Sequence, residues 1–576
     1  MTVMKGKDAL VTMLQAEGVR YVFGNPGTTE LPLLDAIQDS PQLRYITGLQ
    51  EATPLFMADG YARSTGRPAF VNVHVTAGLG NTVGALYNVF KGGTPLVLTA
   101  GQSSTRQLLR EPVLGSNMVN VVREHTKWAA EVIHPEDISV AVRRAFKVAK
   151  TPPTGPVFLS LPWDVLDQEA DFLDLKASSE GYFRVRPDVA AVERAAHLLA
   201  GAHNPVMLVS DRVAQSGASA AAVRVAEQLG TRVYATQFAE VNFPTAHPQF
   251  MGMLNLSWPG PGVRDTLAQA DVILAVGTNV VGQFTDTPEP LVGPQARIVH
   301  LDSSAWEIEK TYPVEAALWC DPLAGLLELS VALEGEMSAT QREAARTRAA
   351  TIGEESRRRR EAFQKRLRAR WGHVPISPER MMWELRGALP PQAIIADESI
   401  TCRGTLMQSV DFAKEGDMFA IRGGGLGWAM PGALGIQLAQ PDRSVVAVVG
   451  DGAAMYTIQA LWTAARYHIP VTYVMCNNRS YKVLKEGTAR YLAGTDRVSE
   501  YVGMNFHELP LDFVKLGEAF GIQGVRVEDP EALGPALRDS MGSGEPRMVD
   551  VVIDDTVAVQ DLQAEWAGWF AGRPAS

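Results

Sequence analysis

Short apolar runs alternate with helix-spaced apolar residues along most of the chain. Between residues 20 and 170, the runs YVFGNPG, RYITGLQEA, FVNVHVTAG, PLVLTAG and PVFLSLP are separated by stretches with helical spacing. Such alternation predicts a parallel sheet with helices on both faces. Ahead of these runs, Ala9, Leu10 and Met13 share one helical face, so an amphipathic first helix is expected here and not a signal peptide.

The alternation recurs twice, so the chain is expected to be an α/β protein with three consecutive open, mainly parallel-sheet domains. The runs PVMLVS, RVYAT, VILAVG and RIVHLD predict a second sheet, and AIIADES, SVVAVVG, VTYVMCNN and MVDVVID predict a third. A charged segment before the third sheet mixes acids with its arginines, which favours a solvated helix over a basic arm that binds nucleic acid. The expected divisions are 1–175, a polar linker at 176–188, a central domain at 189–334, a helical linker at 335–374 and a third domain at 375–560.

The bulk composition narrows the class of partner. A chain of 576 residues is too long for a single core, which agrees with several domains. The net charge of -11 disfavours nucleic acid and anionic membranes as partners. The three cysteines lack the spacing of metal ligands, which is typical of a reducing cytoplasm. The longest uncharged run, GGGLGWAMPGALGIQLAQ, is rich in glycine and contains Pro431, so it is a poor membrane span.

The third predicted sheet carries the clearest chemical pattern, VVAVVGDGAAMYTIQALW followed by VTYVMCNN. Two buried strands with a helix between them form one β-α-β unit, whose strands are expected to be parallel and to end at the same edge of the sheet. Asp451 and the pair Asn477 and Asn478 should therefore leave that edge together, where open α/β sheets bind their ligands.

The residue types at this edge suit a bound metal ion. A carboxylate and an amide oxygen are ligands for a hard cation such as Mg2+, which completes its shell with water and phosphate oxygens. Backbone N–H groups at the helix start beyond the turn suit the phosphate itself. The expected ligand is a diphosphate carried on magnesium, and a P-loop is excluded because no GK[ST] follows the glycines. The alternative is a plain turn with capping asparagines, but the asparagine pair on the next strand favours the metal site.

GDG followed by NN at the end of the next strand resembles the signature of thiamine diphosphate-dependent enzymes. The resemblance extends through VFGNPG, LQEA, ADGYA, NVHVTAGLGN, GGLGWAMPGALGIQLAQP and MCNN, and it points to 2-oxo acid decarboxylases of the benzoylformate decarboxylase type. It implies thiamine diphosphate and Mg2+ as cofactors, and successive pyrimidine-binding, central and diphosphate-binding domains. It also implies that the side chains of Asp451 and Asn478 and the main-chain oxygen of Ser480 hold the cation.

The resemblance implies roles for three residues of the first domain. Glu51, in GLQEATPLF, would hydrogen-bond the aminopyrimidine ring of the cofactor and promote loss of its C2 proton; the alternative is an ordinary acid in a first helical turn. His74, in VHVTAG, would assist substrate binding and proton transfer, a role that suits histidine in general. Thr28, in GNPGTTE, would contact the substrate carboxylate.

Further residues are implied to contact the cofactor. Leu426 would be an apolar prop that bends the cofactor, although leucine is more commonly part of a core. Gly424 would offer its backbone oxygen to the amino group of the cofactor. The remaining predicted contacts are Thr401, Gly452, Ala453, Ala454 and Tyr481.

The sequence departs from the decarboxylase pattern at several positions. Phe284 stands where the resembled enzyme has a second active-site histidine, and a phenyl ring carries no proton. Ala453 and Ile400 stand in place of hydroxyl residues. Fewer side chains can therefore bind the diphosphate, and backbone N–H groups would have to provide more of its hydrogen bonds. The expected substrate pocket also differs, at Val483, Lys485 and Gly487.

The resemblance implies non-oxidative decarboxylation of a 2-oxo acid to an aldehyde and CO2, with carboligation as a side activity. A carboligase of the acetolactate synthase type is the first alternative. The histidine in VHVTAG disfavours it, because carboligases of that type usually lack a histidine there, whereas Phe284 favours it, because a missing proton relay would slow protonation of the intermediate. A dinucleotide-binding oxidoreductase is a weaker alternative, because the central VILAVGTNVVG lacks GxGxxG. A cofactor-binding protein without catalysis is the third. The resemblance also implies a homodimer or homotetramer with active sites between chains.

Overall fold

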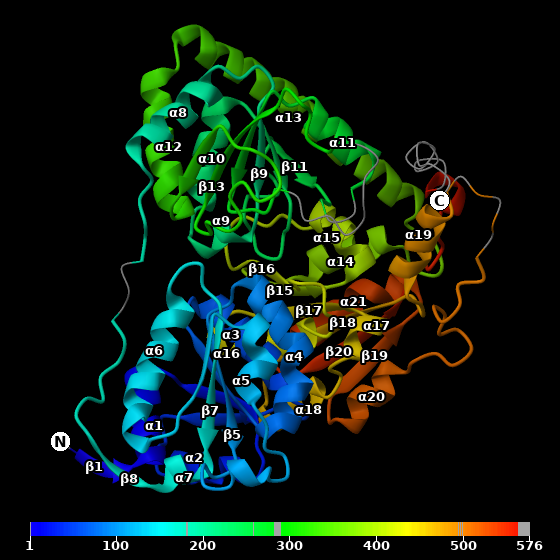
Figure 1. Cartoon of the computed structure of the whole chain (residues 1–576). Helices are drawn as coiled ribbons and strands as arrows, with labels where there is room; N and C mark the ends of the chain where they lie inside the picture. The colour runs from blue at the N-terminus through cyan, green and yellow to red at the C-terminus, as the bar shows by residue number, and fades with distance from the viewer. Residues whose placement is uncertain are drawn as a thin grey trace.

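The computed structural model describes residues 2–562 apart from 180–182, 257–258, 281–289, 494, 496 and 498. It contains three six-stranded sheets, and all the strand pairings within them are parallel. Figure 1 shows the first sheet (blue) and the third (yellow to red) beside each other, with the central domain (green) above them. The predicted fold of three open parallel sheets is confirmed.

The first sheet is covered by helices on both faces. In spatial order its strands are β3 (Arg44–Thr47), β2 (Tyr21–Asn25), β4 (Ala69–Val73), β5 (Leu96–Gln102), β7 (Pro156–Pro162) and β6 (Trp128–Glu131), and its main helices are α1 (Gly6–Ala16), α3 (Ala52–Thr65), α4 (Val75–Gly92) and α6 (Ile138–Lys150). Leu10 and Met13 of α1 are fully buried, as their spacing predicts. Strand β6 was not predicted, because its residues WAAE are all half-buried and show no alternation.

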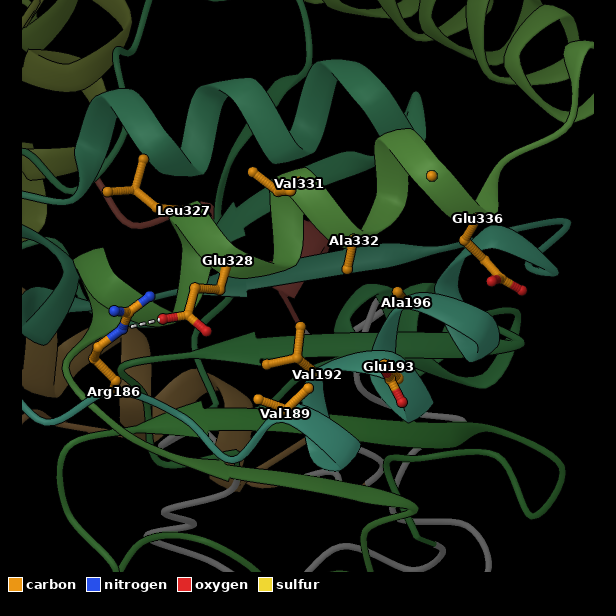
Figure 2. A pocket seen from close by; sticks show the side chains of 11 residues that line it. Arg186, Val189, Val192, Glu193, Ala196, Leu327, Glu328, Val331, Ala332 and Glu336 are labelled. Atoms are coloured by element: carbon orange, nitrogen blue, oxygen red, sulfur yellow. Dashed lines mark hydrogen bonds and ion pairs between the residues drawn. The ribbon is translucent and has the colours of Figure 1, made fainter.

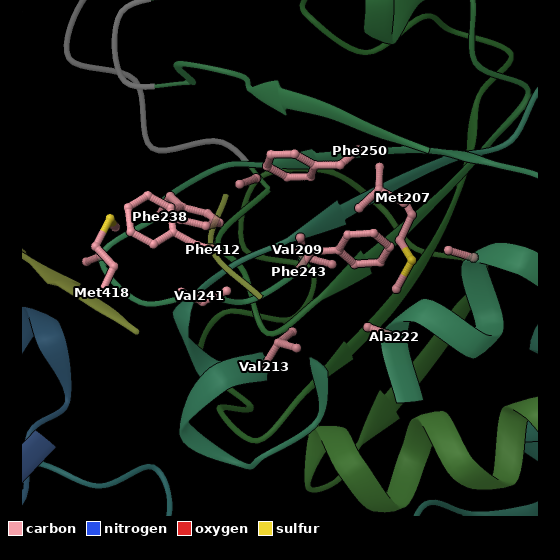
Figure 3. Packing of buried hydrophobic residues seen from close by; sticks show 14 of the residues in the cluster. Met207, Val209, Val213, Ala222, Phe238, Val241, Phe243, Phe250, Phe412 and Met418 are labelled. Atoms are coloured by element: carbon pink, nitrogen blue, oxygen red, sulfur yellow. The ribbon is translucent and has the colours of Figure 1, made fainter. Parts of the chain in front are cut away.

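The central sheet has a core rich in phenylalanine. In spatial order its strands are β11 (Phe250–Met253), β10 (Arg232–Ala235), β9 (Val206–Val209), β12 (Val272–Val276), β13 (Arg297–Asp302) and β14 (Ala316–Trp319), and its main helices are α8 (Val189–Ala200), α10 (Ser219–Leu229) and α12 (Pro322–Glu336). Phe238, Phe243 and Phe250 pack together in this core (Figure 3). The edge strands β11 and β14 were not predicted, since each pairs with one neighbour only and is partly exposed, unlike the equally short β9 and β10 inside the sheet.

The third sheet contains the predicted β-α-β unit. In spatial order its strands are β16 (Met418–Ala420), β15 (Ile394–Glu398), β17 (Val445–Gly450), β18 (Val471–Asn477), β20 (Arg547–Val552) and β19 (Gln523–Val527), and helices α16 (Ala429–Ala439) and α18 (Ala460–Tyr467) pack near its centre. All five residues at 445–449 are buried, as expected for a parallel strand covered on both faces. Only the edge strands β16 and β19 were not predicted.

A single long helix, α13 (Ala339–Ala369), occupies most of the predicted helical linker. Ser338 and Gln341 form a capping box at its start, which fixes where the helix begins. Its few buried residues include Ile352 and Phe363, while most of its charged residues are exposed. The segment is therefore helical, as predicted, and the exact domain limits stay a prediction.

The first and third sheets are joined by close packing of α3 against α16. A methyl group added to Gly60 would collide with the main chain of Gly432, and one added to Gly435 would collide with the main chain of Met57. Glycine at these positions therefore allows the two helix backbones to approach each other directly. This contact fixes how the two sheets sit within one chain.

A buried ionic cluster ties the central domain to the other two. Arg63 of α3 bonds Glu240 of the central domain, with Nε 2.9 Å from Oε1. Arg422, just after β16, pairs with Asp211 at 3.2 Å and also with Glu240. An unpaired charge in this buried position would be costly. The cluster therefore favours the relative arrangement of the three domains in which all its charges are paired.

A small antiparallel pair lies beside the first sheet. It joins β1 (Thr2–Lys5) and β8 (Glu169–Phe172), which were not predicted because both are short and largely exposed. Across the described residues, no helix is long and apolar enough to cross a membrane.

Candidate active site

Asp451 lies at the carboxyl end of β17, beside the end of β18. The two strands pair in parallel with Gly450 opposite Cys476, so Asp451 and Asn477 follow at the same level of the sheet. The predicted shared edge is therefore present. Asp451 is 3% exposed, and burial raises the pKa of its carboxyl to about 6.

One oxygen of this buried carboxyl has no protein partner. Asp451 Oδ1 accepts a hydrogen bond from the Gly452 N–H at 2.8 Å. Among the described residues, Asp451 Oδ2 has no hydrogen-bond partner. A buried acceptor without a partner is costly, and a coordinated cation would satisfy it. The residues present at this edge therefore fit a metal ion that carries a diphosphate.

The two asparagines after β18 have different surroundings. Asn477 donates from Nδ2 to Asp550 Oδ1 at 2.9 Å, which fixes it within the sheet. Asn478 is 7% exposed, and its Oδ1 accepts from the Ser480 N–H at 3.0 Å. Asn478 thus contacts Ser480, the other residue after β18 that the resemblance implies as a ligand, and this role stays a prediction.

Tyr481 packs directly against the GDG turn. A methyl group added to Gly452 would lie 2.5 Å from Cε1 of the Tyr481 ring, so glycine is required there. Ala453 and Ala454 are buried in the short helix α17 (Asp451–Ala454). The Gly452 N–H, predicted to face phosphate, donates instead to Asp451 in this structure.

Glu51 sits at the other predicted centre, between β3 and the start of α3. It is 9% exposed, and its two oxygens accept from Asn81 Nδ2 at 2.8 Å and from Asn25 Nδ2 at 3.3 Å. A methyl group added to Gly78 would lie 3.2 Å from Glu51 Oε1, so the carboxyl also packs against the backbone of α4. The sequence indicated Glu51 but not the two asparagines that hold it.

His74 ends β4 and faces a buried acid. Its Nδ1 lies 2.9 Å from Glu30 Oε2 and 3.2 Å from Thr29 Oγ1. Glu30 is 1% exposed and also accepts from the Gly101 N–H at 2.8 Å. A carboxylate at Nδ1 favours a proton on that nitrogen and leaves Nε2 for a substrate. Thr28 is exposed, and it is the neighbouring Thr29 hydroxyl that lies beside the imidazole.

The glycine-rich stretch 423–427 is held by two residues that the sequence did not indicate. Glu398 is fully buried and accepts from the N–H groups of Gly427 and Ala429, both at 2.7 Å. Asn88 of α4 accepts from the Gly425 N–H at 2.9 Å and donates to its carbonyl oxygen. Burial raises the pKa of Glu398 to about 8, although both N–H groups oppose that rise.

The predicted cofactor contacts on this stretch differ in exposure. Gly424 is exposed, with a φ of +88° that favours glycine, and Leu426 is half-buried against the core beneath it. Thr401 is half-buried in a short turn of helix after β15. Ile400 before it has a φ of +48°, a strained backbone for a β-branched residue, beside the expected diphosphate position.

Other predicted positions lie elsewhere. Phe284 falls outside the described residues. A surface cavity of about 550 Å3 between α8 and α12 is lined by residues such as Val189, Leu327 and Val331 (Figure 2). It contains none of the predicted site residues.

The two centres make no direct bond to each other within the described part of the chain. Asn81 contacts Glu51 and Asn88 contacts Gly425, and these two asparagines are seven residues apart on α4, which is about 10 Å along a helix. Within the described part of the chain, no hydrogen bond or ion pair joins Glu51 or His74 to Asp451. Glu51 and Asp451 thus mark two separate centres, called half-sites below, each at the carboxyl ends of a parallel sheet.

Family profiles match all three domains. The profile described as "Thiamine pyrophosphate enzyme, N-terminal TPP binding domain" matches residues 4–122. The central-domain profile of the same enzymes matches 192–329, and their "C-terminal TPP binding domain" matches 401–551. These matches define a thiamine pyrophosphate enzyme, whose domains here are open α/β sheets.

Relatives similar to this chain cover nearly its whole length. A benzoylformate decarboxylase of Pseudomonas aeruginosa is 32% identical over 94% of this chain and 97% of its own. A probable acetolactate synthase large subunit of Methanocaldococcus jannaschii is 28% identical over 96% of this chain and 93% of its own. The solved thiamine diphosphate-dependent 4-hydroxybenzoylformate decarboxylase of Rhodococcus jostii RHA1 superposes with a TM-score of 0.82 at 28% identity, covering 96% of this chain and 99% of its own. The chain belongs to the thiamine diphosphate-dependent enzyme family, in the group that contains benzoylformate decarboxylases and acetolactate synthases.

Proposed function

We propose that this enzyme is a lyase that uses thiamine diphosphate and Mg2+ to decarboxylate a 2-oxo acid to an aldehyde and CO2. The observation that carries the proposal is the buried Asp451 carboxyl, whose Oδ2 has no hydrogen-bond partner among the described residues, at the strand edge shared with Asn478. The pairing of His74 with Glu30 in the first domain supports proton transfer at the end of the reaction. Similarity to a benzoylformate decarboxylase supports the substrate class.

The third domain would hold the cofactor by its charged end. The Asp451 and Asn478 side chains and the Ser480 main-chain oxygen would bind Mg2+, with water and diphosphate oxygens completing the shell. Tyr481 and Thr401 would contact the diphosphate, and Gly424 and Leu426 the rings. When bound, the cofactor supplies a nucleophilic carbon and accepts the electron pair released as the bond to CO2 breaks.

The first domain would handle protons and orient the substrate. Glu51, held by Asn25 and Asn81, would exchange a proton with the pyrimidine ring. His74 would bind the substrate through Nε2 and deliver a proton to the product, while Glu30 holds Nδ1. Thr28 would hydrogen-bond the substrate carboxylate. Burial of Glu51 and Glu30 would help to keep water away from the reacting carbon.

The partner that completes the site would be a second copy of this chain. The rings of the cofactor would need Glu51 and the 423–427 stretch at once, and in one chain these contact α4 at Asn81 and Asn88, about two helical turns apart. Mixing Glu51→Gln protein with Asp451→Asn protein tests this arrangement. Sites shared between chains would regain activity in mixed dimers, whereas sites built within one chain would stay inactive.

A carboligase is the second candidate function. It is supported by the 28% identity to a probable acetolactate synthase large subunit. In a carboligase the acyl group would be transferred to a second carbonyl compound and not protonated. Its product would be a hydroxyketone or an acetohydroxy acid.

The deciding experiment measures CO2 release from a panel of aromatic and aliphatic 2-oxo acids with added thiamine diphosphate and Mg2+. The products are identified with and without a second carbonyl compound. The proposal expects an aldehyde as the main product. A hydroxyketone formed faster than the aldehyde would favour the carboligase, and no CO2 from any acid would contradict both.

We also propose a cytoplasmic location. The three cysteines, Cys320, Cys402 and Cys476, are all free and buried. Burial of unpaired thiols agrees with a reducing compartment. Fractionation of the native host with an antibody against this chain would check it.

A further inference from the structure

A second cavity of about 690 Å3 lies between the central and third domains. It is bounded by α13, by β11, and by α14 (Pro378–Ala388) and α15 (Arg403–Ser409) of the third domain. None of the predicted active-site residues lines it. Its volume lies in the range of small-molecule sites.

The cavity is basic, although the chain as a whole is acidic. Arg359, Arg360, Arg366 and Arg386 line it, against a single acid, Asp411. Asp411 pairs with Arg386 at 3.0 Å. Within the described residues, neither Arg360 nor Arg366 has an ion pair. Their guanidinium groups bond only neutral oxygens: the Ala246 carbonyl at 3.1 Å and Gln408 Oε1 at 2.9 Å.

The floor of the cavity is apolar and aromatic. Phe250 and Phe363 are buried there, and Trp383 is half-buried in the wall. Arg386 lies over the Trp383 ring, 5.0 Å from its centre, which holds the indole in place. A flat ring entering the cavity would meet both aromatic and guanidinium planes, each of which stacks well on heterocycles.

A buried hydroxyl in the same wall also lacks a partner. Ser409 lines the cavity and is 2% exposed. Among the described residues its Oγ makes no hydrogen bond. Buried hydroxyls are normally paired, so this one has unused hydrogen-bonding capacity in the wall of the cavity.

We propose that this cavity binds a phosphorylated ligand with a flat ring, of the nucleoside diphosphate class, separately from thiamine diphosphate. Arg360 and Arg366 would bind the phosphates, because guanidinium groups match phosphate oxygens in pairs. The ring would lie against Trp383, and Ser409 would hydrogen-bond the ligand. The ligand would touch α13, β11 and α15 at once and so would stiffen the junction between two domains.

The test uses the holoenzyme saturated with thiamine diphosphate and Mg2+, so that the active site does not compete for the probe. ADP is titrated by calorimetry, with adenosine and inorganic pyrophosphate as partial probes. We expect ADP to saturate near one molecule per chain with a dissociation constant below about 1 mM, and each partial probe to bind at least about tenfold more weakly.

Variants then locate the site. Arg360→Gln and Arg366→Gln should each weaken ADP binding by about tenfold, since each removes charge-assisted hydrogen bonds. Arg358→Gln is the matched control, because Arg358 is on the same helix, is exposed, and does not line the cavity. Trp383→Phe should lower affinity for ADP but leave pyrophosphate binding unchanged. Circular dichroism confirms that each variant is folded.

Four outcomes would overturn the proposal. They are the absence of saturable ADP binding, an equal loss in Arg358→Gln, pyrophosphate binding as tight as that of ADP, and displacement of ADP by a tenfold increase in thiamine diphosphate. The last outcome would place ADP in the active site. All of these readouts are independent of the decarboxylase activity, so the proposed function can fail or hold without affecting this test.

Discussion

The two half-sites share one architecture but differ in what the protein leaves unsatisfied. Both place a buried acid at the carboxyl ends of parallel strands. Glu51 has both of its oxygens bonded by asparagine side chains. Asp451 has one oxygen bonded and the other without a partner among the described residues. Among the described residues, the first acid has both oxygens bonded without a ligand, whereas the second has one oxygen open to a ligand.

This contrast separates positioning from binding. A fully bonded carboxyl is held in one orientation before any cofactor arrives, which suits a group that must meet a ring nitrogen accurately. A buried carboxyl with an open oxygen stores an unfavourable interaction that a cation can relieve. Substitution of each acid by its amide should therefore produce opposite patterns of damage.

The largest expected effect is that of Glu51→Gln on turnover. Glutamine can keep the hydrogen bonds with Asn25 or Asn81 in part, but it cannot exchange a proton with the cofactor. CO2 release should fall by about 100-fold to 10,000-fold, the range for loss of a general acid or base. Stabilisation by added cofactor, followed by differential scanning fluorimetry, should be nearly unchanged. Turnover equal to that of the unsubstituted enzyme would remove Glu51 from the mechanism.

Asp451→Asn should show the reverse pattern. The neutral amide cannot hold Mg2+ well, so affinity for the Mg2+–cofactor pair should fall by about 100-fold. A loss of that size lowers ligand-induced stabilisation by about 2.7 kcal/mol. The cofactor-free variant should be at least as stable as the unsubstituted protein at pH 8, because a costly buried charge is gone. Thermal unfolding with and without cofactor checks both statements, and an undiminished shift in the variant would contradict the metal site.

Glu398 should make stability depend on pH. Burial raises its folded pKa to about 8 from an ordinary value of 4.5, so the folded state holds this proton more tightly than the unfolded state. The stability that it contributes is complete below about pH 4.5 and is lost as pH rises through about 8. Each pKa unit corresponds to about 1.4 kcal/mol.

Glu398→Gln should flatten this dependence. Urea unfolding between pH 5 and 9 should show the free energy of unfolding of the variant gaining on that of the unsubstituted protein as pH rises. The variant should be less stable at pH 5, since glutamine can accept only one of the two backbone N–H groups. Parallel pH curves for the two proteins would show that Glu398 does not titrate in this window.

The smallest expected effect is that of Thr28→Ala. Thr28 is exposed, and its predicted role is a single hydrogen bond to the substrate carboxylate. Loss of one hydrogen bond of about 1 kcal/mol should raise KM roughly fivefold with little change in kcat. Thr29→Val is the informative comparison, because it removes the hydroxyl beside His74 and should lower kcat instead. If only Thr29→Val affects KM, the carboxylate contact belongs to the neighbouring residue.

The sequence could predict each half-site only where the residues lie near each other along the chain. The β-α-β unit fixed Asp451 and Asn478 at one edge because strand pairing is regular. The supports could not be found in this way. Asn88 and Gly425 are hydrogen-bonded although 337 residues separate them in the sequence. Glu398 accepts a hydrogen bond from Gly427 only because the glycine-rich stretch packs against the end of β15. Nothing in the local pattern around Asn88 or Glu398 signals these contacts.

Several edge strands were not predicted from the sequence for a related reason. Strands such as β11, β16 and β19 have three to five residues, and their pairing depends on the neighbouring strand rather than on their own apolar pattern. The central strands were predicted because both of their faces are buried. Sequence patterning therefore indicated the middle of each sheet better than its borders.

The glycine contact between α3 and α16 sets a limit on how this enzyme can be altered. Gly60, Gly432 and Gly435 leave no room for a side chain. In a library of variants made to change substrate preference, substitutions at these three positions should therefore be the ones that most often prevent folding. Positions such as Val483 and Leu484 on the exposed side of α19 (Lys482–Tyr491) tolerate change far more readily. Substitutions are best introduced at such positions, while the close packing of α3 against α16 is left unchanged.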